Sequence, residues 1–215
     1  MSAKSSLVTG AALVAGAVAA MVTMVLHPTA APAHNVDDWA TFNAAVHVLG
    51  MMSAWLLIAG YFRFTMSIRA TRPLADLALV AFAIGMAVSV LPAARNGLLA
   101  ADVARQVKAH ASAPPEVWPA LARFNFMVDE AFVQVYIAGT ALGILFWSIG
   151  FLSLTGAWPA LGVSGILASG ASLLALVFGH LRTNVHDVGL FVLASTLWTI
   201  VLAILVFRSP SPGGA

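Results

Sequence analysis

The sequence predicts an all-α fold, a bundle of six transmembrane helices in a polytopic membrane protein. Two observations lead to this prediction. Hydrophobic residues make up 61% of the 215 residues and charged residues only 8%, whereas soluble domains are roughly half apolar and about one-quarter charged. The chain also contains six apolar runs, each long enough to cross the ~30 Å hydrocarbon core of a bilayer as a helix.

The composition also restricts the chemistry that the protein can perform. The sequence has no cysteine, which excludes disulfides, thiolate metal ligands and thiol catalysis. The 10 basic and 8 acidic residues are scattered along the chain, so no nucleic-acid-binding surface is predicted. Histidine, aspartate, glutamate and asparagine remain as the side chains on which a binding or catalytic site could be built.

The first predicted span covers residues 7–26, which carry no charge. A secretory signal peptide is the alternative, because Lys4 resembles its basic start and Ala31–Ala33 its cleavage site. The apolar run is longer than the 7–15 residues of a signal-peptide core, so we expect a membrane helix. Small residues recur every four positions around Gly16, a pattern that favours close helix packing in lipid.

The other spans are predicted at residues 41–62, 74–91, 131–154, 160–179 and 188–207. Three arginines, Arg63, Arg69 and Arg72, crowd the short connection between the second and third spans. By the positive-inside rule this connection is cytoplasmic, and both termini are then cytoplasmic as well. Pro92 is expected to end the third span, and residues 209–215 are expected to form a disordered tail.

Residues 95–128 form the long connection on the predicted outer face. Within it, Leu99, Val103 and Val107 recur at helical spacing opposite charged residues. This pattern predicts an amphipathic helix over Leu98–Ala111 that lies on the membrane surface. Such a helix would cover the outer mouth of the bundle as a lid.

The fourth and fifth spans contain small residues that favour close contacts between helices. Gly139-x-x-x-Gly143 is a close-packing motif in the fourth span. The fifth span is rich in glycine and serine, including Gly162, Gly165 and Ser169. We therefore expect the fifth span to be buried between other helices.

Ionisable residues gather near the predicted outer face, where side chains inside a span are costly and tend to face a cavity or one another. We expect His47 and His180 to point into one cavity together with at least one of Asp129, Glu130 and His186. Imidazole and carboxylate ligands suit zinc, copper or iron.

Four polar residues at similar depth extend the candidate site. His27, at the end of the first span, is a further candidate metal ligand. Asn43, Asn125 and Asn184 are candidate cofactor-binding residues. The alternative interpretation is a hydrogen-bond network that only holds the helices together. Two short segments also share an F-N-x-x-V-[HD] pattern, at residues 42–47 and 124–129, although two short matches do not establish an internal repeat.

Three segments carry a resemblance to known proteins: Leu26-His27-Pro28-Thr29, Asn43-x-x-x-His47 and the stretch from Asn125 to Val135. They resemble small six-helix inner-membrane proteins of bacteria. The resemblance implies a location in the bacterial cytoplasmic membrane and implies no activity. Membrane zinc hydrolases of the alkaline-ceramidase and adiponectin-receptor type pair Ser-x-x-x-His with His-x-x-x-His. Here Thr23-x-x-x-His27 matches only in part, and His180 and His186 are six residues apart.

Three function classes follow from these residues. The first, which we favour, is a membrane protein that binds a metal ion or a metal-containing cofactor. The second is a metal-dependent membrane hydrolase of lipid-like substrates, with Glu130 as general base. The third is a non-catalytic accessory subunit of a larger membrane complex. Expected partners are the lipid bilayer and membrane proteins, including further copies of the chain.

Overall fold

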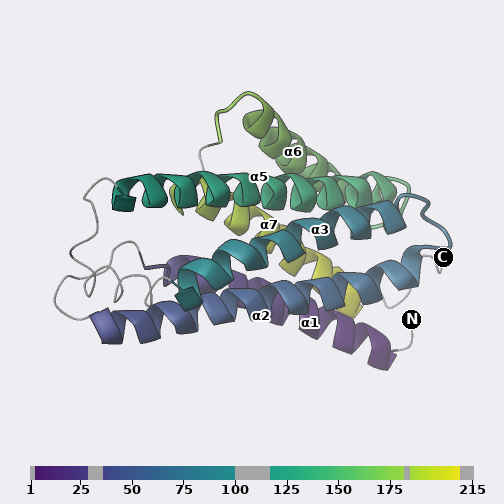
Figure 1. Cartoon of the computed structure of the whole chain (residues 1–215). Helices are drawn as coiled ribbons and strands as arrows, with labels where there is room; N and C mark the ends of the chain where they lie inside the picture. The colour runs from purple at the N-terminus through teal and green to yellow at the C-terminus, as the bar shows by residue number, and fades with distance from the viewer. Residues whose placement is uncertain (1–2, 29–35, 100–116, 182–184, 209–215) are drawn as a thin grey trace.

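The computed structural model describes residues 3–28, 36–99, 117–181 and 185–208, and its regular structure in these ranges is helical (Figure 1). The helices are α1 (Ala3–Val25), α2 (Val36–Ile68), α3 (Ala75–Ala94), the π-helix η1 (Arg95–Leu99), α5 (Val117–Phe151), α6 (Trp158–Val177) and α7 (Val185–Arg208). Six helices in the described ranges are long and apolar enough to cross a membrane. The fold is therefore all-α and compatible with an integral membrane protein.

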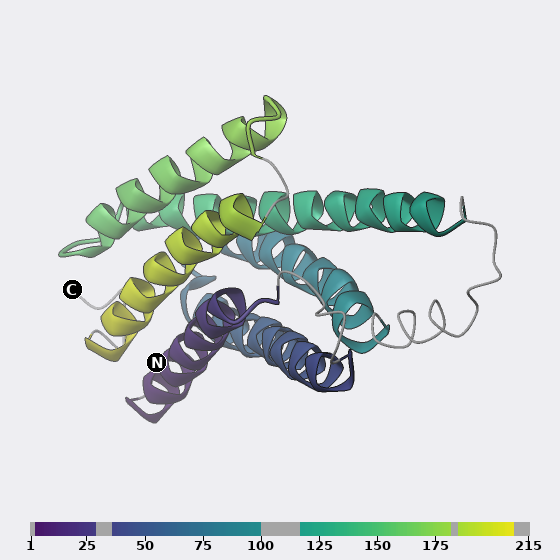
Figure 2. The same cartoon turned by 90° about the vertical axis from the view of Figure 1, so that its left-hand side faces the viewer.

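Helices that follow one another in the chain are also neighbours in space. Helix α1 packs on α2, α2 on α3, α3 on α5 and α5 on α6, while α7 packs on α1 and, less extensively, on α6 (Figures 1 and 2). Helix α6 leans outward from the bundle, and α5 and α7 lie between it and α2. A side chain on α6 is thus remote from the start of α2.

The two ends of the bundle differ in the residues that they carry. We call one the arginine end, because Arg63, Arg69 and Arg72 lie where α2 finishes and α3 begins. The first turn of α1 and the last turn of α7 lie at this end too (Figure 1). We call the other the histidine end, because His27 follows α1 there and His47 lies near the start of α2.

Aromatic side chains fill the core toward the arginine end. The Tyr61 ring stacks on the Trp147 ring with 4.5 Å between centroids. The Tyr61 hydroxyl shares a 2.7 Å hydrogen bond with the Thr199 hydroxyl, and Trp147 Nε1 donates to Thr65 Oγ1 at 3.1 Å. Buried polar groups are costly unless they are hydrogen-bonded, so these bonds let large aromatic residues occupy the core and join α2, α5 and α7.

Glycines allow α3 and α5 to cross in close contact. A Cβ atom on Gly139 would lie 2.7 Å from the Ala81 carbonyl oxygen, and one on Gly85 would lie 2.8 Å from the Thr140 nitrogen. Gly143 meets the Phe82 side chain in the same way. The predicted close-packing motif is confirmed, because backbones this close leave no space for a side chain.

The predicted burial of the glycine- and serine-rich span holds for only one face of α6. On that face Gly162, Gly165 and Ser169 are buried. A Cβ on Gly170 would meet nothing within 4 Å, and Leu167 is 68% exposed. Helix α6 is therefore a peripheral helix, since only its inner face is covered by α5 and α7.

Helices α2, α3 and α5 are longer than the sequence predicted, and α2 covers Val36–Ile68 instead of residues 41–62. Pro92 does not end α3, which continues to Ala94 and then widens into η1. Proline removes one backbone donor and crowds the preceding turn, and a π-helical turn is one way to accommodate the resulting distortion. Helix α5 begins at Val117 instead of residue 131, with Pro119 tolerated because first-turn amides need no helical partner.

The predicted lid and tail lie largely or wholly beyond the described residues. Of the predicted surface helix Leu98–Ala111, the structure describes only Leu98 and Leu99, which are exposed in η1. The tail, 209–215, lies outside the described ranges. Both predictions therefore remain untested.

Candidate functional site

A cluster of seven polar side chains lies at the histidine end, where η1 joins α2 to α5. The polar cluster consists of His27, Asn43, His47, Arg95, Asn96, Asn125 and Asp129. Its members come from four places in the chain: the end of α1, the first turns of α2, η1 and the first half of α5. The cluster therefore ties together segments that are far apart in sequence.

Hydrogen bonds and one ion pair connect the amide and carboxylate members. Asn43 Nδ2 donates to the Asn96 carbonyl at 2.6 Å, and Asn96 Nδ2 donates to Asp129 Oδ2 at 3.1 Å. Arg95 forms an ion pair with Asp129 and donates to the Asn125 carbonyl at 2.9 Å. This part of the cluster is a bridge from α2 through η1 to α5.

Two histidines form the other part of the cluster. The His27 and His47 rings meet edge to face, with 5.1 Å between centroids and 63° between planes. His47 is buried, and its Nδ1 lies 2.8 Å from the Asn43 carbonyl oxygen. Because a carbonyl only accepts, Nδ1 of His47 is assigned as the donor of this hydrogen bond.

The π-helical turn packs directly against His47. A Cβ atom on Gly97 would overlap the Cβ of His47, and Gly97 is buried. Only glycine lets η1 approach α2 this closely. The position of the His47 ring thus depends on the backbone of η1 as well as on Asn43.

Some buried polar atoms at the histidine end lack a hydrogen-bond partner among the described residues. Within the described part of the chain, His27 Nδ1, Asp129 Oδ1 and Trp39 Nε1 are buried and make no hydrogen bond. Each such atom costs about 1–3 kcal/mol, and bound water or an ion is a common explanation. The polar cluster therefore retains capacity to bind a small polar ligand.

The surroundings of His27 favour its neutral form. Burial lowers its pKa from the usual 6.5, the nearby His47 lowers it further, and a backbone hydrogen bond at Pro28 opposes both. A neutral imidazole is the form that binds a metal ion. At neutral pH His27 is therefore in the ligand-competent form.

Several predicted site residues do not join this cluster. His180, after α6, and His186, in the first turn of α7, are both exposed. Helix α6 packs on α5 and α7 (Figures 1 and 2), and among the described residues the ring contact of His47 is with His27 and not with His180. Glu130 is half-buried on α5, but it is not among the cluster's contacts. Asn184 lies outside the described residues.

The predicted convergence of His47 and His180 on a three-ligand metal site is not found. Among the residues that the structure describes, no group of three or more histidine and acidic side chains could hold a metal ion. The sequence predicted the depth of these residues along the helices, whereas ligation also requires them to face the same direction.

Sequence reasoning missed the contribution of Arg95, Asn96 and Gly97. A signal was present, because both F-N-x-x-V-[HD] segments contact this turn. Asn43 of the first segment bonds Asn96, and Asp129 of the second pairs with Arg95. Arg95 follows an apolar run at its predicted outer end, and Asp129 lies at a similar predicted depth. An ionisable residue near a span needs a partner, so the two could have been paired from the sequence.

Comparisons of the chain with protein-family models, with curated proteins and with solved structures find no match. Its function is therefore interpreted from the geometry of its own residues.

Proposed function

We propose that this protein is a multi-pass protein of the bacterial cytoplasmic membrane that binds a first-row transition-metal ion through His27 and His47. The six apolar helices support the membrane location. The three arginines at the opposite end support an orientation with the histidine end outside and both termini in the cytoplasm. The bacterial assignment follows from the resemblance in the sequence.

The observation that carries the proposal is the spacing of the two imidazoles. Rings that share one tetrahedral metal ion at ~2.0–2.1 Å have centroids about 5 Å apart. The His27 and His47 centroids are 5.1 Å apart. Zinc, copper and iron are the metals that imidazole ligands suit.

The atoms around the pair support the same proposal. Metal-binding histidines usually donate their second ring N–H to a carbonyl or carboxylate, and His47 Nδ1 does so to Asn43. His27 Nδ1 is buried without a partner among the described residues. The Arg95–Asp129 ion pair next to the histidines is neutral overall, so it adds no net repulsion toward a cation. Water or a substrate would complete the coordination.

Metal analysis of the purified protein tests the proposal. Protein purified without chelators and loaded with zinc or copper is expected to retain a stoichiometric metal ion by elemental analysis. His27→Gln and His47→Gln, which keep polarity but remove the ligand nitrogen, are expected to lose it. His180→Gln is the matched control, because His180 is exposed and outside the cluster. Equal retention by all four proteins would contradict the proposal.

The second candidate function is that of a non-catalytic accessory subunit, whose polar cluster only holds the bundle together. The observation that favours it is the bridge from Asn43 through Asn96 to Asp129, which is hydrogen-bonded internally and needs no ligand. If the wild-type protein retains no metal after loading, this candidate replaces the first. A hydrolase would need Glu130 beside the metal, and the cluster's contacts do not place it there.

A further inference from the structure

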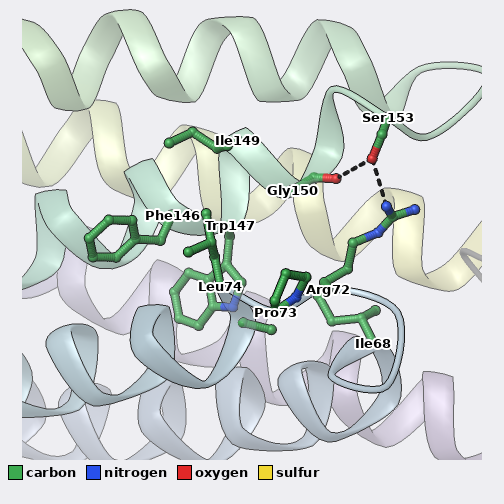
Figure 3. A pocket seen from close by; sticks show the side chains of 10 residues that line it. Ile68, Arg72, Pro73, Leu74, Phe146, Trp147, Ile149, Gly150 and Ser153 are labelled. Carbon is green, nitrogen blue, oxygen red and sulfur yellow. Dashed lines mark hydrogen bonds between the residues drawn. The ribbon is translucent and has the colours of Figure 1, made fainter.

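A groove opens at the arginine end, between the α2–α3 connection and the last turns of α5 (Figure 3). Its volume is about 160 Å³, and its walls include the apolar side chains of Ile68, Leu74, Phe146 and Ile149. This volume is below that of sites for drug-sized ligands, which measure roughly 300–1,000 Å³. The groove can therefore hold only part of a larger apolar molecule.

Arg72 lies at the rim of the groove, and none of the described residues that line the groove is acidic. Its Nη1 donates to the Ser153 hydroxyl at 2.6 Å (Figure 3). The ion pair between Arg95 and Asp129 lies at the other end of the bundle. The stem of Arg72 lies over Gly150, where an added Cβ would be 3.7 Å from Arg72 Cδ. An apolar groove with an unneutralised guanidinium at its rim suits an amphipathic anion.

The position of the groove indicates which kind of amphipathic anion would bind there. Candidate membrane spans end at Ile68 and Phe151, and another begins at Ala75, so the groove lies at the boundary of the apolar region. Lipid headgroups lie at this depth, and clustered arginines on the cytoplasmic side attract anionic lipids. The exposed Arg63 and Arg69 add positive charge at the same end.

We propose that this groove binds one anionic phospholipid, with the phosphate on Arg72 and Ser153 and the first part of an acyl chain along Ile68, Leu74 and Phe146. Arginine is well suited to phosphate, because its planar donors match the phosphate oxygens. The inference rests on the proposed membrane location and is independent of the metal site. The exposed Asp76, in the first turn of α3, does not line the groove.

Lipid titration of the full-length protein in detergent tests this inference. Bound phosphatidylglycerol and phosphatidylcholine are counted by native mass spectrometry, and wild type is expected to prefer phosphatidylglycerol. Arg72→Gln is expected to weaken phosphatidylglycerol binding about fivefold, the effect of one interfacial charge. Arg69→Gln is the matched control, since Arg69 is exposed and does not line the groove.

A second variant distinguishes the contribution of the apolar groove to lipid binding from that of the Arg72 charge. Gly150→Leu fills the groove and keeps Arg72, so it is expected to weaken phosphatidylglycerol binding as well. Circular dichroism and thermal unfolding in detergent show whether each variant is folded, and neither measurement depends on the metal proposal. Equal losses in Arg72→Gln and Arg69→Gln would show diffuse attraction and overturn the inference. Normal lipid binding by Gly150→Leu, or full competition by inorganic phosphate, would also overturn it.

Discussion

Arg95 and Arg72 lie at opposite ends of the same bundle, and their side chains have different partners: a carboxylate for Arg95 and a hydroxyl for Arg72. Arg95 is 25% exposed, pairs with Asp129 and donates to Asn125. Arg72 bonds the neutral hydroxyl of Ser153. A charge enclosed between helices requires a counter-charge from the protein, because removal from water is costly. A charge at the rim can stay hydrated, so it needs no counter-charge from the protein.

The largest expected effect comes from breaking the enclosed ion pair. Asp129→Asn keeps the shape of the side chain but leaves Arg95 without its counter-charge. We expect thermal unfolding in detergent to report a loss of about 2 kcal/mol, below the 3–5 kcal/mol of a fully buried pair because both groups are partly exposed. Asp76→Asn, at an exposed position, is the control and should change stability by less than about 1 kcal/mol. If Asp129→Asn and Asp76→Asn lose the same free energy of unfolding, the enclosed ion pair contributes no more to stability than an exposed charge.

A smaller effect is expected where η1 contacts α2. Gly97→Ala places a Cβ against His47, so η1 must move away from α2. Overpacking of this kind costs about 1–3 kcal/mol, and we expect a value near the lower limit because η1 is at the edge of the bundle. Gly170→Ala, which faces open space on α6, should be neutral or slightly stabilising. Metal retention of Gly97→Ala should also fall, because the His47 ring moves.

Lowering the pH is expected to reduce the free energy of unfolding by less than about 1 kcal/mol through His27, at the histidine end. The pKa of His27 is lower in the folded protein than the usual 6.5, so below about pH 6.5 the unfolded chain binds more protons and stability falls. Metal-free wild type should therefore lose stability between pH 7.5 and 5.5, and His27→Gln should lose less. An identical pH profile for the two proteins would show that His27 is not buried in its neutral form.

The smallest effect is expected at the arginine end. Arg72→Gln should change unfolding stability by less than about 0.5 kcal/mol, because the side chain is bonded only to a hydroxyl at the surface. Arg95→Gln is the matched variant at the histidine end and should cost more, since it leaves Asp129 unpaired. Equal stability of the two variants would indicate that Arg95 gains nothing from its enclosed position.

Much of the polar cluster could be predicted from the sequence. His27, Asn43, His47, Asn125 and Asp129 were identified because each lies near the predicted outer boundary of an apolar run. Their depth along the helix axis follows from counting residues at 1.5 Å each. Which of them meet was not predicted, because the expected group was His47 and His180 with at least one of Asp129, Glu130 and His186. The polar cluster holds His47 and Asp129 of that group.

Composition and run length were enough to predict the all-helical class, the six apolar helices and the end at which polar residues gather, because they set how a helix fits a bilayer. The peripheral position of α6 and the contact between Arg95 and Asp129 became visible only in the folded structure. The physical reason is that lipid and helix core are equally apolar, so a membrane helix lacks the polar face that would indicate its rotation. Rotation is set by close packing, as at Gly97 against His47, which one-dimensional periodicity does not encode.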